Sequence, residues 1–415
     1  MKLSFKYNPR MTELQSSIIE ELSFHTTKLY NMANYDLVTN GFKPYEKMNT
    51  LHASNWHKEY LHSHNYQQCL KVLDKNWKSY FSALQDFKCN PLKYKGMPMP
   101  PKYKNLDRKK NEIIFTNQSV RIKEDMLMLS LSKPIKEKYK VDSLDFALPK
   151  KVQSLVSLDR LQQVKVKYDD TLKQWCLIII YQKETASLPT GYQNVMAVDL
   201  GSTNLAACTY LFNDDTLLLS GKPLKSVTSH VNKQIARLQG ISMSMHGSKI
   251  HRNTKAIRKL YRYLDNYGMD YLHKASTLLV NDAYEKHCAT IVIGDIRDIK
   301  QEMDYNKMFV QLPLKTFRDM ITYKAKLLGM EVVIVNESYT SGCSALDIEP
   351  VDRGSYDKSR RIKRGLFVSV KGILVNADIN GSLNILRKYT KCIPRLIESA
   401  RDKGCVDNPV KLRVA

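Results

Sequence analysis

Two aspartates stand at positions where carboxylates commonly bind metal ions. Asp199 lies in the apolar segment 194–201, which reads as a buried strand, and ligands gather at the carboxyl ends of such strands in open α/β sheets. Asp378 begins the segment 376–388, which is expected to be a helix, and an aspartate there can equally be a helix cap. Small residues, Ala377 and Gly381, would let this helix press close to a sheet. The pair predicts a metal site only if further carboxylates converge on it, because hydrolysis of a phosphodiester by two metal ions places the ions about 3.5–4 Å apart.

The second half of the chain, residues 191–389, shows the order of elements that places these aspartates together. Apolar runs with turn residues between them predict strands, and apolar residues at helical spacing predict helices. The predicted order is three strands (194–201, 204–212, 215–221), a helical stretch (227–289), a strand (290–296), a helix (312–329), a strand (331–337), an insertion (338–375) and a last helix (376–388). This is the order of a ribonuclease H-like α/β fold.

The first half of the chain has a different pattern. Residues 11–90 read as helical, and Tyr66 and Trp77 belong to an aromatic stripe that is most simply core, although such residues also stack on bases. Residues 1–10 and 91–190 show the short alternating runs of antiparallel hairpins, which predict a small β-barrel with the helical segment inserted in it. Residues 390–415 have weak periodicity and are expected to become ordered only on RNA. The predicted class is an α+β multi-domain protein.

The charge of the chain favours a polyanionic partner. Lysine and arginine number 65 against 41 acidic residues, a formal net charge of +24. Nucleic acid neutralises such a surplus and gains from counterion release, whereas the alternative is a solvated, solubilising surface. The residues predicted to contact phosphate are Lys71, Lys75, Lys78, Arg252, Lys255, Arg258, Lys259, Arg262, Lys358, Arg360, Arg361, Lys363 and Arg364.

Four segments, in chain order, resemble the split RuvC nuclease domain of the transposon-encoded TnpB family, relatives of type V CRISPR effectors. They are "VMAVDLGSTNLAACTY", "TIVIGDI", "NESYTSGCSALD" and "RRIKRGLF" followed by "ILVNADINGSLNILRK". The resemblance implies a RuvC nuclease domain over 191–389, a barrel (wedge) domain over 1–10 and 91–190, and a helical recognition domain over 11–90. Many members carry two C-x-x-C pairs in the insertion, where this chain has Cys343 alone, so we predict no zinc site.

Gly294 is the main departure from the family pattern, because many members carry a catalytic glutamate there. Asp295 follows it, but side chains alternate along a strand, so Asp295 should point to the opposite face. Glu337 ends the neighbouring strand in the expected sheet order, about 5 Å away at its Cα, and a glutamate can cross that gap when the facing residue is glycine. This arrangement resembles a branch of the family with a relocated glutamate. We therefore predict Asp199, Glu337 and Asp378 as catalytic and metal-binding residues; for Glu337 the alternative is a structural ion pair.

The resemblance implies an RNA-guided DNA endonuclease. Such a protein binds a guide RNA, recognises a short target-adjacent duplex motif and cleaves double-stranded DNA with two Mg²⁺ ions. One alternative is an RNA-guided DNA-binding protein without nuclease activity, with Gly294 as the trace of a lost site. Another is a guide-free RuvC-like resolvase or transposase. We expect a cytoplasmic monomer without membrane association, because the longest apolar run, residues 175–181, is far too short to span a bilayer.

Overall fold

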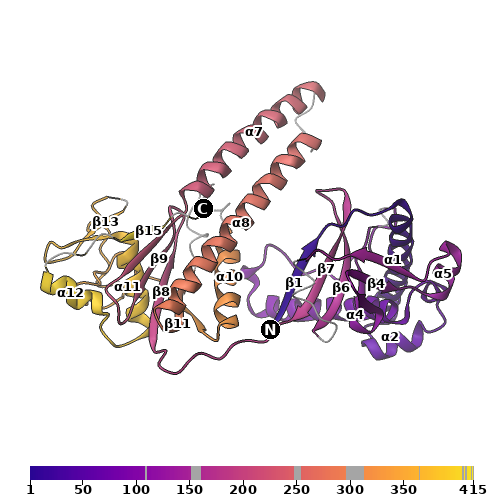
Figure 1. Cartoon of the computed structure of the whole chain (residues 1–415), viewed down its shortest axis with the longest axis horizontal. Helices are drawn as coiled ribbons and strands as arrows, with labels where there is room; N and C mark the ends of the chain where they lie inside the picture. The colour runs from indigo at the N-terminus through magenta and orange to yellow at the C-terminus, as the bar shows by residue number, and fades with distance from the viewer. Residues whose placement is uncertain are drawn as a thin grey trace. The chain divides into compact units, whose positions relative to one another are not determined.

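The chain forms two compact units, Met1–Lys183 (unit 1) and Glu184–Ala415 (unit 2), each described by itself (Figure 1). The computed structural model describes residues 1–107, 110–150, 160–246, 254–295, 313–363 and 365–403, together with 406, 409–412 and 414. Within these ranges, every helix is too short or too polar to cross a membrane.

Unit 1 inserts helices between its first and second strands. Strand β1 (Lys2–Tyr7) is followed by α1 (Glu13–Asn40), α2 (Tyr45–Leu51), α3 (Trp56–Glu59) and α4 (Ser63–Cys89). One sheet has the order β1-β7-β6-β2, with β2 Ile113–Thr116, β6 Leu161–Asp169 and β7 Gln174–Gln182. The other has the order β3-β4-β5, with β3 Val120–Lys123, β4 Met126–Ser130 and β5 Ser143–Ala147, and α5 (Lys133–Tyr139) joins β4 to β5.

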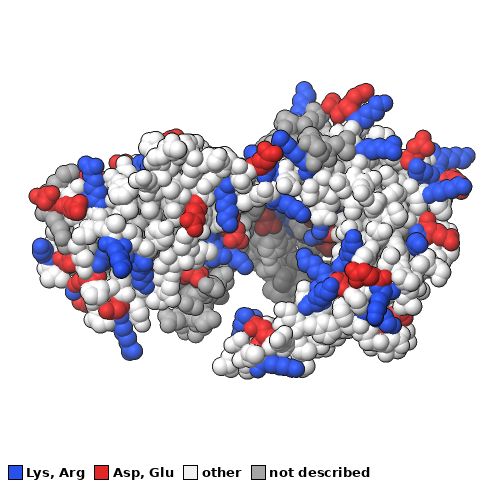
Figure 2. Space-filling model, turned by 90° about the horizontal axis from the view of Figure 1, so that it is seen from below, with Lys and Arg blue, Asp and Glu red and all other residues white. Residues whose placement is uncertain are grey.

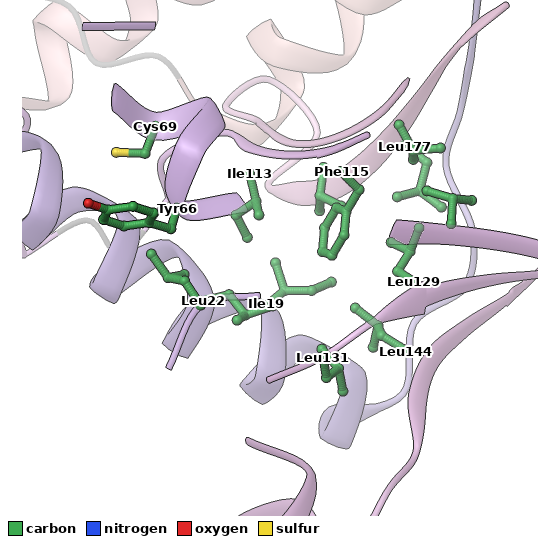
Figure 3. Packing of buried hydrophobic residues seen from close by; sticks show 14 of the residues in the cluster. Ile19, Leu22, Tyr66, Cys69, Ile113, Phe115, Leu129, Leu131, Leu144 and Leu177 are labelled. Carbon is green, nitrogen blue, oxygen red and sulfur yellow. The ribbon is translucent and has the colours of Figure 1, made fainter. Parts of the chain in front are cut away.

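The sequence predicts that the strands of unit 1 form a small β-barrel. Among the described residues they belong to two sheets, because the chain turns through a short 3-10 helix, Asn117–Ser119, between β2 and β3 and leaves the first sheet there. Both sheets and the inserted helices contribute to one hydrophobic core, where Ile19 of α1, Phe115 of β2 and Leu144 of β5 gather (Figure 3). Tyr66 and Trp77 are buried in this core, so the aromatic stripe of α4 is mainly structural.

Unit 2 is built on a six-stranded sheet with the order β12-β11-β8-β9-β10-β15. Strand β8 (Asn194–Leu200) lies beside β11 (Cys288–Asp295), which lies beside β12 (Glu331–Asn336), and all three are parallel. On the other side of β8, β9 (Asn204–Tyr210) is antiparallel to both β8 and β10 (Thr216–Ser220). Three strands, helices, strand, helix, strand and helix follow one another in the predicted order.

The helices of unit 2 cover the sheet on both faces. They are α7 (Lys222–His246), α8 (Lys255–Glu285), α10 (Leu314–Leu327), α11 (Ala377–Tyr389) and α12 (Arg395–Lys403). Met196, Val198 and Ile293 face α8 and α10, whereas Ala197 and Val292 face α11. Beyond the sheet, α7 and α8 run side by side through a small apolar cluster of their own (Figure 1). A hairpin of β13 (Leu366–Val368) and β14 (Leu374–Asn376) leads directly into α11.

The segment after residue 390 differs from its prediction. The expectation was order only on RNA, but the chain forms α12 in the structure without RNA. The buried Leu396 and Ile397 of this helix pack on the α11 side of the sheet. Strand β15 (Val410–Leu412) then pairs with β10, in parallel, and becomes the edge of the sheet. Pairing with an existing edge strand supplies the order that the weak periodicity does not reveal.

Candidate active site

Asp199 lies near the end of β8 on the face covered by α11. A Cβ atom built on Gly381 of α11 would stand 2.6 Å from Oδ2 of Asp199, closer than real Cβ atoms approach an oxygen. A larger residue at position 381 would therefore force the Asp199 carboxylate or the helix to move. The close approach of helix and sheet that the sequence predicts is present at this point.

Glu337 reaches over Gly294 from the neighbouring strand. Strands β11 and β12 pair in parallel with Gly294 opposite Val335, and Glu337 follows one residue after β12 ends. A Cβ atom on Gly294 would lie 2.6 Å from Oε2 of Glu337 and 3.4 Å from its Cβ. The carboxylate of Glu337 thus occupies the space that a side chain on Gly294 would need. Since Ile293 pairs with Val198, the next residues of these two strands are Gly294 and Asp199.

Asp378 lies in the first turn of α11, and its carboxylate is not a helix cap. Asn376 is the N-cap, and its side-chain oxygen accepts hydrogen bonds from the backbone N–H groups of Asp378 and Ile379. The carboxylate of Asp378 instead accepts a hydrogen bond of 2.7 Å from the Asn204 amide and pairs with Arg361 at 3.5 Å. Its two oxygens therefore lie at the surface of the site, beside β9 and the insertion.

The charges of Asp199 and Asp378 interact. Burial, followed by the charge of Asp378, raises the pKa of Asp199 to about 7, and Arg361 opposes this effect. A buried carboxylate whose ionisation is disfavoured by a neighbouring negative charge lies in an environment that a cation would stabilise. Within the part of the chain that the structure describes, however, no three His, Cys, Asp or Glu side chains are grouped closely enough to hold a metal ion. Asp199 and Asp378 are near each other, and Glu337 covers Gly294, without the three meeting at ligand distance.

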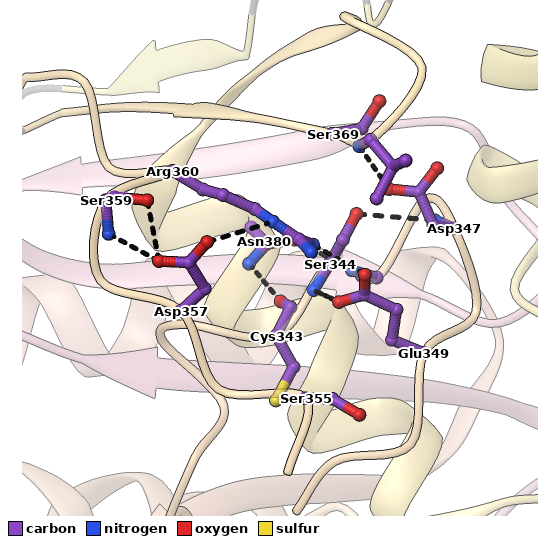
Figure 4. Close-up of polar contacts among 12 residues, drawn as sticks. Cys343, Ser344, Asp347, Glu349, Ser355, Asp357, Ser359, Arg360, Ser369 and Asn380 are labelled. Atoms are coloured by element: carbon purple, nitrogen blue, oxygen red, sulfur yellow. Dashed lines mark hydrogen bonds and ion pairs between the residues drawn. The ribbon is translucent and has the colours of Figure 1, made fainter. Parts of the chain in front are cut away.

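Helix α11 also holds the loop that carries Glu337. Asn380 donates to the carbonyl of Cys343 (2.9 Å) and accepts from the backbone of Ala345 (3.0 Å), as Figure 4 shows in part. Asn384, one turn later, donates to the carbonyls of Thr340 and Cys343. Thr340 in turn donates its hydroxyl to the carbonyl of Glu337 at 2.8 Å. The same helix thus carries Asp378, makes room for Asp199 and fixes the segment after Glu337.

Sequence reasoning missed these positioning residues. Asn380, Ser382 and Asn384 are fully buried on a helix whose other buried positions are mostly apolar. Ser382 donates to the carbonyl of Ala197 on β8 at 3.0 Å. Buried polar side chains need hydrogen-bond partners, so polar residues on the buried face of "NGSLN" were the signal available for a constrained site.

The predicted basic residues of the insertion have different surroundings. Arg361 pairs with Asp378 at the site itself. Arg360 instead pairs with Glu349 at 2.5 Å and approaches Asp357, so it ties the insertion together (Figure 4). Lys358 and Lys363 are exposed, and Arg364 lies outside the described residues.

The remaining predicted phosphate contacts lie on two helices. On α8, Lys255, Lys259 and Arg262 are exposed and Arg258 is partly buried; Arg252 lies outside the described residues. On α4, Lys75 is exposed, Lys78 pairs with Asp74 at 2.8 Å and Lys71 lies over the ring of Tyr45. On the face drawn in Figure 2, basic side chains are spread among acidic ones and do not form a single patch.

Comparison with known proteins agrees with the family resemblance. Residues 178–300 match a family model described as "Probable transposase", and residues 315–385 match one described as "Cas12f1-like, TNB domain". The TnpB-like protein ORF457 of Acidianus two-tailed virus is 24% identical over 91% of this chain and 82% of its own length. A CRISPR-associated endodeoxyribonuclease Cas12f1 of Sulfoacidibacillus thermotolerans is 26% identical over 53% of this chain, which spans about half (52%) of that protein.

The fold also resembles a solved structure. A Cas12f1 chain from a cryo-EM structure of a Cas12f1–sgRNA–target DNA complex superposes with a TM-score of 0.57, at 13% identity, over 91% of this chain and 83% of that one. These matches confirm the resemblance to the TnpB family and show a mixed α+β fold similar to Cas12 effectors.

Proposed function

We propose that this relative of the TnpB and Cas12f proteins is an RNA-guided DNA endonuclease that hydrolyses phosphodiesters at Asp199, Glu337 and Asp378. The observation that carries the proposal is the position of Glu337, whose Oε2 lies where a side chain on Gly294 would begin. Gly294 on β11 has no side chain, and the carboxylate of Glu337, from the segment after β12, lies at this position.

The residues of the site fit Mg²⁺. All three candidate ligands are carboxylates, the oxygen donors that Mg²⁺ prefers, and the raised pKa of Asp199 reflects burial and a neighbouring negative charge that a cation would relieve. Asp199, Glu337 and Asp378 would hold two ions, which when bound activate water and stabilise the leaving oxygen. Asn204 orients the Asp378 carboxylate through its amide.

Arg361 would act on the substrate side of the site. Its guanidinium, 38% exposed, is placed 3.5 Å from Asp378 and carries the charge needed to bind a phosphate of the cleaved strand. The exposed lysines and arginines of α8 and the insertion would follow the backbones of guide RNA and target DNA. Base pairing with the guide would supply sequence recognition, together with a short duplex motif next to the target.

One observation favours a second candidate, a guided DNA-binding protein that does not cleave. Among the described residues, the three carboxylates are not grouped at ligand distance, and Arg361 forms an ion pair with Asp378. The two functions share RNA and DNA binding and differ in hydrolysis, so one experiment separates them.

The experiment starts from protein purified with the RNA that it retains through high-salt washing. Sequencing that RNA defines the guide, and a plasmid library carrying the matching target is incubated with the complex in Mg²⁺ or in EDTA. Guided cleavage in Mg²⁺ that is abolished by Asp199→Asn supports the endonuclease. Target binding without cleavage in either condition supports the second candidate, and absence of any defined RNA contradicts both.

A further inference from the structure

Local hydrogen bonds shape the backbone around Glu337. Strand β12 ends at Asn336, so the strand pairing with β11 no longer holds the backbone at Glu337. Thr340 donates both its N–H (3.2 Å) and its hydroxyl (2.8 Å) to the carbonyl of Glu337. The side-chain oxygen of Asn336 accepts a hydrogen bond of 2.7 Å from the N–H of Ser338. These bonds join residues that are close in sequence, so they form a turn but do not connect it to another element.

Lys388, in the last turn of α11, connects this turn to the helix. Its ammonium donates to the carbonyl of Asn336 at 3.1 Å and to the carbonyl of Ser338 at 2.6 Å. One ammonium group therefore bonds to the residue before Glu337 and to the residue after it. Because Thr340 bonds to the carbonyl of Glu337 itself, three successive carbonyls of this segment have donors.

The usual structural explanation for a lysine at this position does not account for these contacts. Basic residues are favoured in the last turn of a helix, where they interact with the negative end of the helix dipole. The ammonium of Lys388, however, donates to carbonyls that lie 52 and 50 positions earlier in the chain. Lys388 is partly buried, and burial lowers its pKa, whereas Cys343 and Glu337 oppose this shift. The cation is thus partly shielded from water near the candidate carboxylate.

The chemistry of lysine suits the contact with this turn. An ammonium has three donors and no acceptor, so it can serve two carbonyls at once, and hydrogen bonds from a charged donor are stronger than those from a neutral one. Glu337 lies between the two bonded carbonyls, and its Oε2 is 2.6 Å from the point where a Cβ on Gly294 would stand. A backbone shift at either neighbour of Glu337 would therefore move this carboxylate.

We infer that Lys388 is a positioning residue, which holds the backbone on both sides of Glu337 so that its carboxylate lies at the metal site. The inference rests on the function proposed above, because it takes Glu337 as a ligand of Mg²⁺. Groups that orient metal ligands contribute about 10–100-fold to metal affinity or activity. The opposite effect is expected if Lys388 acts only through its charge, since a cation near the site repels Mg²⁺ and its removal would then strengthen metal binding.

The test measures metal affinity on full-length protein freed of nucleic acid. Mn²⁺ is the probe, and electron paramagnetic resonance of the free ion gives Kd. Lys388→Met removes the three donors and keeps most of the side-chain volume, so it is expected to weaken Mn²⁺ binding at least about tenfold. Lys388→Arg keeps donors for both carbonyls and should recover most of the wild-type affinity. Lys391→Met, at an exposed lysine shortly after α11, is the matched control and should leave Kd unchanged.

A double variant shows whether Lys388 acts through Glu337. Glu337→Gln should weaken Mn²⁺ binding by itself, because it removes the charge of a ligand. Lys388→Met in addition to Glu337→Gln should cause little further loss, because residues that act through one another have non-additive effects. Melting temperatures verify folding, and Lys388→Gln, whose side chain is too short to reach both carbonyls, replaces Lys388→Met if that variant does not fold.

The inference is overturned if Lys388→Met binds Mn²⁺ as the wild type does, even with a lower melting temperature, since Lys388 would then serve stability alone. Tighter binding by Lys388→Met, or additive losses in the double variant, would overturn it as well. Failure of the proposed function has a different result: Glu337→Gln would bind Mn²⁺ as the wild type does, which would remove Glu337 as a metal ligand and the inference with it.

Discussion

The two faces of the unit 2 sheet differ in chemistry: one is apolar, and the other carries buried amides and carboxylates. Successive residues of a strand point to opposite faces. Ile293 and Val198 point to the apolar face under α8 and α10. Gly294 and Asp199, the next residues, point to the face under α11, where buried amides and carboxylates gather. Asp295 returns to the first face, 3.8 Å from Arg318 of α10. The alternation of a strand thus decides which acid can belong to the site and which belongs to the packing.

The largest effect on guided cleavage is expected from removal of the Glu337 carboxylate, which lies on the α11 face of the sheet. Glu337→Ala should lower guided plasmid cleavage by at least about 10³-fold, because a residue that acts on the reacting phosphate is lost. Guide RNA retention and target binding should be unchanged. Glu331→Ala, at the exposed start of β12, is the control and should cleave as the wild type does.

Undiminished cleavage by Glu337→Ala would remove this residue from the mechanism. Equal losses in cleavage and in RNA retention would indicate a folding defect.

A smaller effect on cleavage is expected from a substitution in α11, the helix that covers the polar face of the sheet. Asn384→Ala removes two hydrogen bonds to the carbonyls of the loop after Glu337. Groups that orient the residues around a metal contribute about 10–100-fold, so cleavage should fall by that amount. Two measurements distinguish a positioning role of Asn384 from a role in stability alone. Positioning predicts a change in the Mg²⁺ concentration needed for half-maximal cleavage, whereas a loss of stability alone lowers the melting temperature without that change.

The smallest effect on cleavage is expected from a substitution on the face covered by α8 and α10. Asp295→Asn should leave the cleavage rate unchanged and lower the free energy of unfolding by about 1 kcal/mol or less, since it weakens one ion pair with Arg318. Cleavage rates and urea unfolding measure the two quantities independently. A large loss of cleavage with unchanged stability would instead identify Asp295 as the site carboxylate.

The sequence predicted the elements whose signal is local. Apolar runs identified β8, β11 and β12, and strand alternation placed Asp295 on the opposite face from Gly294. The sequence left open whether Asp378 is a helix cap; the hydrogen bonds that the side chain of Asn376 accepts show that Asn376 has that role.

Features that depend on distant partners could not be predicted. The strand at 410–412 has only three residues, and it pairs with the edge strand β10. The split of unit 1 into two sheets depends on one turn between β2 and β3. Likewise, a run of basic residues gives no indication that Arg360 binds Glu349 while the adjacent Arg361 faces Asp378.

Placing the glutamate on β11 instead of at position 337 tests whether Glu337 substitutes for a side chain at position 294. In Gly294→Glu/Glu337→Gly, the glutamate originates from Gly294, and the atoms of Glu337 that would collide with its Cβ are removed; the end of Ile385, at 2.9 Å, is the remaining close neighbour. We expect this double variant to cleave guided plasmid in Mg²⁺ at least about tenfold faster than Glu337→Gly alone, because a carboxylate again occupies the same position. Equal inactivity of the two variants, with folding and RNA retention intact, would contradict the claim that Glu337 takes the place of a side chain at position 294.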